Sequence, residues 1–177
     1  MSLSNTLPGV PYEGEFYTYA RQPSPQLSIH TFIEETMNVT FLDQDADIPK
    51  VLDLLIQLRP QFTPQSLLAQ IKKQRESGYQ LVYVESEGRI LGVAGFLEGE
   101  KLSWGKYIYI DDLVVDESSR NNGVGTLLLD WFKIRCKNQG FDQLHLDSGV
   151  QRFKAHRFYQ REKFRISSHH FVTKSFK

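Results

Sequence analysis

The spacing of hydrophobic and polar residues predicts a chain in which strands and helices alternate. Segments in which hydrophobic residues recur at helical spacing predict helices. They span residues 48–58, 64–77, 126–137 and 153–161. Segments rich in β-branched and aromatic residues predict strands. They span residues 38–42, 79–85, 89–97, 107–115, 143–147 and 166–176. This order of elements predicts an α/β layer fold.

Turns between the strands indicate how they pair. Residues 86–88, with the sequence Ser-Glu-Gly, predict a hairpin turn, and a second polar turn is predicted near residues 98–101. The strands at residues 107–115 and 143–147 are joined through a helix. A connection of that length predicts that these two strands run parallel.

The start of the chain differs from the rest in composition. It contains four prolines and no sustained hydrophobic period, and the prolines are Pro8, Pro11, Pro23 and Pro25. We therefore predict an irregular arm at residues 1–37 and one domain at residues 38–177. A chain of 177 residues is compatible with a single hydrophobic core.

Charge and cysteine content narrow the class of protein. Lys plus Arg and Asp plus Glu both number 21, so no net positive field exists to attract nucleic acid or an anionic membrane. The single cysteine, Cys136, cannot form an internal disulfide and is interpreted as a small core residue. The chain shows neither a signal peptide nor a long apolar run, which predicts a cytoplasmic protein.

The turn between the strand at residues 107–115 and the following helix has the features of an anion site. It consists of Arg120, Asn121, Asn122, Gly123, Val124, Gly125 and Thr126. Backbone N–H groups in the first turn of a helix have no intrahelical partner, and the helix dipole favours negative charge there. Gly123 and Gly125 would let phosphate oxygens approach these donors. Arg120 would add a charge-assisted contact.

The spacing within this turn distinguishes between phosphate-binding families. It lacks the Lys-Ser/Thr pair of a P-loop, and Leu128 occupies the position of the third glycine of a dinucleotide fingerprint. It resembles instead the Arg/Gln-x-x-Gly-x-Gly/Ala motif of the GCN5-related N-acetyltransferase (GNAT) superfamily. The resemblance covers about residues 39–176. It implies acetyl-CoA as cofactor, with its pyrophosphate held by the turn.

The same resemblance implies a particular sheet. GNAT proteins have a mixed, mostly antiparallel sheet with two splayed central parallel strands and helices on both faces. The backbone of Leu113, Val114 and Val115 would then lack a neighbouring strand. Unpaired backbone groups require another partner, and the resemblance implies that the pantetheine arm of the cofactor supplies it.

Two adjacent carboxylates interrupt the strand just before these residues. Deprotonating a lysine-like amine at pH 7 costs about 4 to 5 kcal/mol, and a carboxylate acting as general base lowers that barrier. Asp111 and Asp112 are the candidates, unless they only form a solvated strand end or cap the turn. Because neighbouring residues of a strand point to opposite faces, we expect only one of them to face a given pocket.

The run Tyr-Ile-Asp-Asp-Leu-Val-Val before the turn is similar to the diamine acetyltransferase branch of the superfamily. That similarity implies that Asp111 is a water-assisted base and that Asp112 helps to hold the substrate ammonium.

Tyr159 lies where the superfamily places a tyrosine that protonates the thiolate of coenzyme A. A hydroxyl with a pKa near 10 suits a proton donor, although a tyrosine on a short helix is also a common core residue. The family often has Asn at the position of Arg152 and Gly at that of Lys163. The cofactor contact of that Asn is therefore assigned to Arg152 or Ser148.

Other polar and aromatic residues carry weaker signals. Four of the five histidines, His145, His156, His169 and His170, show no metal-ligand spacing, and no metal is predicted. His145 is kept as a secondary base because it alternates with leucines on its strand. Four aromatic residues would line an acceptor site or pack the core, namely Tyr83, Trp104, Tyr107 and Tyr109.

The sequence thus predicts an acetyl-CoA-dependent N-acetyltransferase that transfers the acetyl group directly to a primary amine on a small molecule or a peptide. Two alternatives are an acyl-CoA-binding module or sensor without turnover and a nucleotide-binding domain. Neither a nucleic acid nor a membrane is expected as partner, and a homodimer is compatible with the sequence.

Overall fold

The structure, a computed structural model, describes residues 37–174. The predicted N-terminal arm, residues 1–37, lies outside this range except for Met37. The strands are β1 (Asn38–Phe41), β2 (Gln80–Ser86), β3 (Arg89–Lys101), β4 (Gly105–Val115) and β5 (Gln143–Leu146). The helices are α1 (Pro49–Leu58), α2 (Pro64–Arg75), α3 (Val124–Gln139) and α4 (Phe153–Arg161). Short 3₁₀ turns, η1 (Asp45–Asp47) and η2 (Glu117–Ser119), precede α1 and α3.

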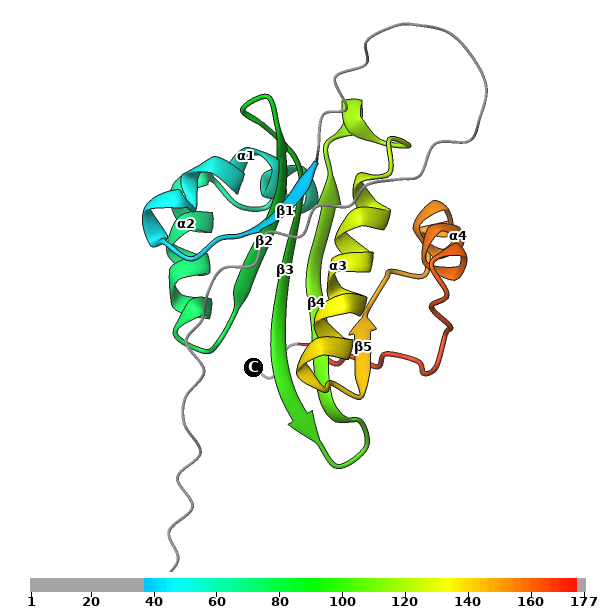
Figure 1. The fold of residues 1–177 in the computed structure, drawn as a ribbon. Helices are drawn as coiled ribbons and strands as arrows, with labels where there is room; N and C mark the ends of the chain where they lie inside the picture. The colour runs from blue at the N-terminus through cyan, green and yellow to red at the C-terminus, as the bar shows by residue number, and fades with distance from the viewer. Residues whose placement is uncertain (1–36, 175–177) are drawn as a thin grey trace, which may run out of the picture.

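The five strands form one mixed sheet in the order β1-β2-β3-β4-β5 (Figure 1). The first three pairings are antiparallel, and β4 pairs with β5 in parallel. The prediction of a mixed, mostly antiparallel α/β sheet is therefore confirmed. Pairing between β4 and β5 begins at Tyr107 and ends at Ile110. β5 ends at Leu146, opposite Ile110, so the β5 side of residues 111–115 has no strand partner among the described residues.

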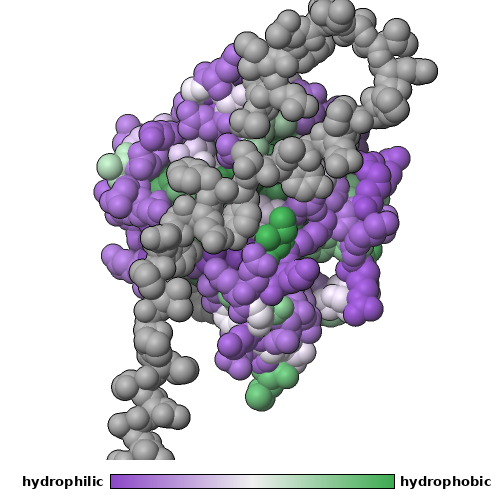
Figure 2. Space-filling model, in the orientation of Figure 1, coloured by the Kyte–Doolittle hydropathy of each residue, from purple (hydrophilic) through white to green (hydrophobic). Residues whose placement is uncertain are grey.

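Helices cover both faces of the sheet, as predicted (Figure 1). One core cluster packs α1 and α2 against the sheet, and the other packs α3 and α4 against the opposite face. Neighbouring strand residues alternate between them: Val93 belongs to the α1–α2 cluster and Ala94 to the α3 cluster. Hydrophilic residues cover most of the described surface visible in Figure 2.

The hairpin between β3 and β4 is longer than predicted. The polar residues near 98–101 continue β3 and pair with β4 as far as Lys101 and Gly105. A Cβ atom on Gly99 would lie 2.7 Å from the hydroxyl of Tyr107. Gly99, within the predicted turn, instead leaves space for the tyrosine ring across the strand pair.

The predicted last strand is wrong over its described part. Residues 166–174 contain no strand, and β5 is consequently an edge of the five-stranded sheet rather than central. The hydrophobic side chains of this segment, Ile166, Phe171 and Val172, are exposed. The polar run Ser-Ser-His-His at residues 167–170 interrupts the alternation that a half-buried strand needs.

A β-bulge in β4 changes which face its side chains reach. Gly95 pairs with Asp112 and Phe96 pairs with Ile110, so Asp111 is the extra residue of the bulge. Ile110 before the bulge and Leu113 after it both join the α3 cluster, although strict alternation would separate them. Both aspartates consequently border the α1–α2 face. The expectation that only one of them faces a given pocket is wrong for this reason.

Candidate active site

The turn before α3 has the backbone of an anion cradle. Asn121 and Gly123 adopt left-handed conformations, with φ of 69° and 82°. The first α-helical bond of α3 runs from the N–H of Leu127 to the carbonyl of Gly123, at 2.9 Å. The preceding N–H groups have no acceptor in the helix. A Cβ atom on Gly123 would meet nothing within 4 Å, so no described residue crowds the side-chain position of Gly123.

The side chain of Val124 attaches the cradle to the sheet, whereas that of Arg120 faces solvent. Val124 is buried, and a Cβ atom on Gly92 of β3 would lie 2.7 Å from its Cγ1 atom. The side chain of Val124 is therefore part of the core, and only its backbone is available to a ligand. Arg120 is exposed and pairs with Glu117, with 3.2 Å between Nη1 and Oε1.

The next two cradle residues contact α4. A Cβ atom on Gly125 would lie 3.0 Å from the ring of Phe158. The hydroxyl of Thr126 donates to Oε1 of Glu162 at 2.7 Å, and Lys133 lies 3.2 Å from Oε2 of the same carboxylate. These contacts fix α4 against the start of α3. Gly125 and Thr126 thus have packing roles that the sequence did not indicate.

Tyr159 is carried by this fixed helix. Its ring packs against Phe158 and Phe164, with centroid separations of 5.4 and 6.0 Å. Burial raises the pKa of the Tyr159 hydroxyl, and the charge of Arg152 opposes that rise. The hydroxyl is therefore protonated at neutral pH and is able to donate a proton.

Asp112 is held by two partners on its two carboxylate oxygens. Nε of Arg59, which follows α1, lies 2.7 Å from Oδ1. The hydroxyl of Tyr79, which precedes β2, donates to Oδ2 at 2.7 Å. Burial and the neighbouring Asp112 raise the pKa of Tyr79 well above its usual value. Asp112 consequently links the end of α1, the start of β2 and the bulge of β4.

Asp111, one residue earlier, has a different environment. Burial raises the pKa of its carboxyl, the charges of Asp112 and Asp147 act in the same direction, and Arg59 opposes them. Nη2 of Arg59 donates to the backbone carbonyl of Asp111 at 3.0 Å. The arginine thus contacts the backbone of the bulge, and within residues 37–174 no cation forms an ion pair with the Asp111 carboxylate.

Gly95 makes the link between Tyr79 and Asp112 sterically feasible. A Cβ atom at position 95 would lie 1.7 Å from the Tyr79 hydroxyl oxygen. We expect Gly95→Ala to displace that hydroxyl and to lower the free energy of unfolding by about 1 to 3 kcal/mol. Urea denaturation tests this, with Gly149→Ala as control because the nearest atoms to a Cβ there belong to the end of the exposed, flexible Gln151 side chain. Equal losses in the two variants would contradict the proposed crowding at Gly95.

A cavity of about 340 Å³ lies next to the bulge, between α1, α2 and β4. Polar side chains and a few hydrophobic ones line it: Leu55, Arg59, Gln61, Phe62, Leu67, Gln70, Ile71, Gln74, Tyr79, Asp111 and Asp112. The sequence predicted only the two aspartates among them as site residues. The cavity brings both to one place and adds Arg59 and Tyr79.

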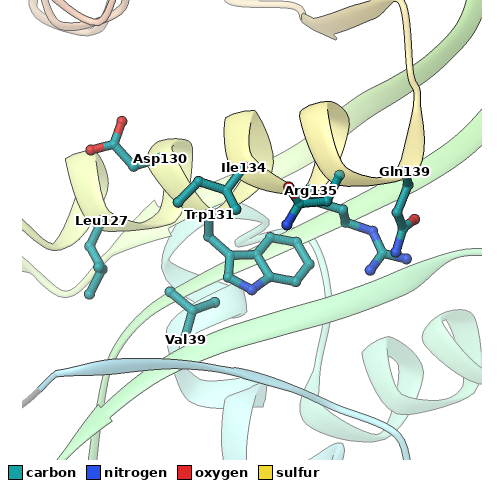
Figure 3. A pocket seen from close by; sticks show the side chains of 8 residues that line it. Val39, Leu127, Asp130, Trp131, Ile134, Arg135 and Gln139 are labelled. Atoms are coloured by element: carbon teal, nitrogen blue, oxygen red, sulfur yellow. The ribbon is translucent and has the colours of Figure 1, made fainter. Parts of the chain in front are cut away.

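A second cavity, of about 100 Å³, lies between α3 and the edge strand β1. In Figure 3 the indole of Trp131 lies between the helix and Val39 of β1, and Leu127 and Ile134 extend from the same helix. None of the predicted site residues lines this cavity. Cradle, acidic pair and Tyr159 all lie elsewhere.

Three of the predicted aromatic residues gather with His145 beside β4 and β5. Trp104 stacks on the His145 ring at 3.8 Å, and Lys101 lies 4.0 Å above the Trp104 ring. Burial and Lys101 lower the pKa of His145. Tyr107 and Tyr109 complete the cluster. The fourth predicted residue, Tyr83, is buried in the α1–α2 cluster instead.

Comparison with known proteins decides the family. Residues 48–164 match the profile described as the acetyltransferase (GNAT) family. This chain belongs to the GNAT family. A curated relative, the uncharacterized N-acetyltransferase YhdJ of Bacillus subtilis (strain 168), is 31% identical over 108 residues, which are 60% of this chain and 75% of the relative.

Solved GNAT structures share the fold. An acetyltransferase of Trypanosoma brucei is 25% identical, with a TM-score of 0.64 over 78% of this chain and 99% of that one. Glucosamine-6-phosphate N-acetyltransferase of Arabidopsis thaliana is 24% identical, with a TM-score of 0.63 over 81% and 100%. An aminoglycoside N-acetyltransferase in complex with CoA is 13% identical, with a TM-score of 0.69 over 82% and 100%.

The residues of this GNAT domain fit a coenzyme A molecule at the cradle. No described residue crowds the side-chain position of Gly123, and the edge of β4 at residues 111–115 lacks a strand partner. The hydroxyl oxygen of Ser148, just after β5, is buried and has no hydrogen-bond partner among the described residues. A buried hydroxyl without a partner is costly, so a ligand atom there would stabilise it. Arg152 is exposed directly before α4.

Burial raises the pKa of Cys136 to about 11, so its thiol is protonated at neutral pH and is a poor nucleophile. Within residues 37–174, no helix has the length and hydrophobicity needed to cross a membrane.

The sequence missed the residues that hold the site together. Arg59 and Asp112 are 53 positions apart, and Thr126 and Glu162 are 36 positions apart. No local pattern links such pairs. A recognisable signal was present only at Gly95, since an isolated glycine within a strand pattern often marks a bulge or a close approach.

Proposed function

We propose that this protein transfers the acetyl group of acetyl-CoA to a primary amine, in a single step with both substrates bound. The proposal rests on one observation: the unpaired edge of β4, the cradle and the helix that carries Tyr159 adjoin one another. The edge of β4 without a strand partner leads toward the open cradle, and the helix bearing Tyr159 is fixed to the same end of α3.

In this proposal the cradle holds the pyrophosphate of coenzyme A. The backbone N–H groups from Gly123 to Thr126 supply the donors, and the helix dipole favours the negative charge. Asn121, Asn122 and Arg120 contribute at the rim. The backbone of Leu113, Val114 and Val115 pairs with the pantetheine amides, while Ser148 and Arg152 contact the cofactor from the other side.

When bound, acetyl-CoA supplies a thioester carbon to which the amine nitrogen bonds while the carbon–sulfur bond breaks. Asp111 takes up the proton that the amine loses, directly or through water. Tyr159 donates its hydroxyl proton to the departing thiolate. Backbone N–H groups of β4 after the bulge polarise the carbonyl. Both side chains then regain their starting protonation by exchange with solvent.

Asp112 has a supporting role in this scheme. Both of its oxygens already accept bonds from Arg59 and Tyr79. We therefore assign it to stabilising the bulge that presents Asp111 rather than to binding the acceptor ammonium, the role that the resemblance implied.

A thiol-release assay with acetyl-CoA and a panel of amines tests the function. We expect release that depends on an amine, with kcat/KM falling as the pH drops and Asp111 becomes protonated. Because the folded protein raises the pKa of Asp111, this acidic limb lies above the usual carboxyl value of about 3.9. In Asp111→Asn that limb should be lost.

Binding without turnover gives a different result. If acetyl-CoA raises the melting temperature but no amine releases thiol, the protein is an acyl-CoA-binding module. If ATP or NAD raises the melting temperature and coenzyme A does not, the cradle belongs to a nucleotide-binding domain.

A further inference from the structure

We propose that the acceptor is a compact amine with a single positive charge and uncharged hydroxyl or amide groups, bound in the cavity between α1, α2 and β4. This inference rests on the proposed function and names the class of its second substrate.

The charges that line the cavity favour a monocation. Its charged side chains are Arg59, Asp111 and Asp112, which together carry one net negative charge. Arg59 lies 2.7 Å from Asp112 and offsets that carboxylate. Only the charge of Asp111 is left to attract a ligand. A second ammonium group in the same space would lose hydration without gaining a carboxylate.

Of the charged groups outside the cavity, Asp147 interacts with Asp111, but water screens its charge. Asp147 beyond β5 is 56% exposed, and its carboxylate lies 3.1 Å from a ring nitrogen of His170. Tyr109 on β4 interacts with Asp147, which helps to keep its hydroxyl protonated. Tyr79, on the inner side, is a neutral donor to Asp112.

The uncharged part of the lining favours hydroxyl or amide groups on the ligand. Gln61, Gln70 and Gln74 line the cavity from α2 and the loop before it. A glutamine side chain both donates and accepts hydrogen bonds, so it satisfies hydroxyl and amide groups equally well. Pockets for small molecules span about 300 to 1,000 Å³. A cavity of about 340 Å³ is at the lower end of that range and suits a compact ligand.

A matched pair of acceptors isolates the effect of charge. Aminopentanol and pentanediamine have the same chain length and differ in whether the far end is a hydroxyl or a second ammonium. We expect the wild type to acetylate aminopentanol with a kcat/KM about tenfold higher than that for pentanediamine. A tenfold ratio corresponds to about 1.4 kcal/mol, which is the size of a screened interaction between two charges. A lysine tripeptide should be a poorer acceptor than aminopentanol.

Substitutions in the Arg59–Asp112 pair should change the ratio of kcat/KM for aminopentanol to that for pentanediamine according to the net charge that they leave. Arg59→Gln exposes a second carboxylate, so the ratio should shift about tenfold toward the diamine. Arg59→Gln combined with Asp112→Asn restores one net negative charge and should restore the preference for aminopentanol. Arg59→Lys keeps the charge and should keep the preference. Lys73→Gln is the control, because it removes one positive charge from the exposed face of α2.

Calorimetric titration of the two amines into CoA-saturated protein gives a readout that does not depend on turnover. A wild-type preference for the diamine, or a ratio that is the same in Arg59→Gln and the double variant, would overturn the inference while leaving acetyl transfer intact. If Arg59→Gln fails to fold by its melting curve, Gln70→Glu decides the question, because it adds a carboxylate to the lining of the cavity. The ratio should then shift toward the diamine, and an unchanged ratio would overturn the inference. Absence of thiol release with every amine would instead remove the proposed function itself.

Discussion

Replacing Tyr159 with phenylalanine is expected to lower kcat by about 100-fold, the usual contribution of a general acid. The change removes only the hydroxyl group. The ring keeps its contacts with Phe158 and Phe164, so α4 should remain in place. The KM for acetyl-CoA should change little, because the proposed cofactor contacts lie in the cradle and β4. Thiol release under saturating substrates measures the effect.

A matched tyrosine provides the control for this experiment. Tyr83 is buried beside α1 and belongs to the other core cluster, so Tyr83→Phe should leave kcat within about twofold of the wild type. Equal kcat values for the wild type and Tyr159→Phe, at equal melting temperatures, would remove the tyrosine from the mechanism. A loss of kcat that coincides with a large fall in melting temperature would assign Tyr159 a packing role instead.

The elements predicted correctly are those that a local pattern specifies. α1 and α2 follow the helical spacing of their hydrophobic residues, and α3 follows a strand and a glycine-rich turn. The hairpin between β2 and β3 follows from Ser-Glu-Gly at residues 86–88. In each case the signal lies within a few residues of the element that it predicts.

The wrong predictions concern features that depend on a partner distant in sequence. The bulge at Asp111 exists only in relation to Gly95 of β3, so the two aspartates were assigned to opposite faces. The extension of β3 to Lys101 depends on its pairing with β4. The hydrophobic residues of the last segment resemble a strand, but residues 166–174 do not join the sheet.

In the candidate site, too, the parts that are contiguous in sequence were predicted and the contacts between distant residues were not. The cradle is contiguous in sequence, and its geometry follows from Gly123 and the start of α3. The groups that orient it were not predicted, because Glu162 reaches Thr126 and Arg59 reaches Asp112 only in the folded chain. The sequence therefore indicated where a diphosphate would bind more completely than how the acceptor amine would be recognised.

Introducing a carboxylate into the cradle should weaken cofactor binding about 100-fold while the protein still folds. Gly123 has a φ of 82°, a region that Asn and Asp adopt more readily than other residues with a side chain. A Cβ atom there meets nothing within 4 Å. Gly123→Asp should therefore fold with some backbone strain and place a negative charge where we propose that the diphosphate binds. A repulsion of about 2.7 kcal/mol, within the range for charges near a protein surface, weakens CoA binding about 100-fold.

Gly123→Asn is the matched control, since it has almost the same shape without the charge. The decisive measurement is a calorimetric titration of CoA into the wild type, Gly123→Asn and Gly123→Asp, with melting curves for all three. We predict that the asparagine variant binds CoA within about tenfold of the wild type and that the aspartate variant loses about 100-fold in affinity. Equal CoA affinity in all three folded proteins would show that the diphosphate does not bind at the start of α3.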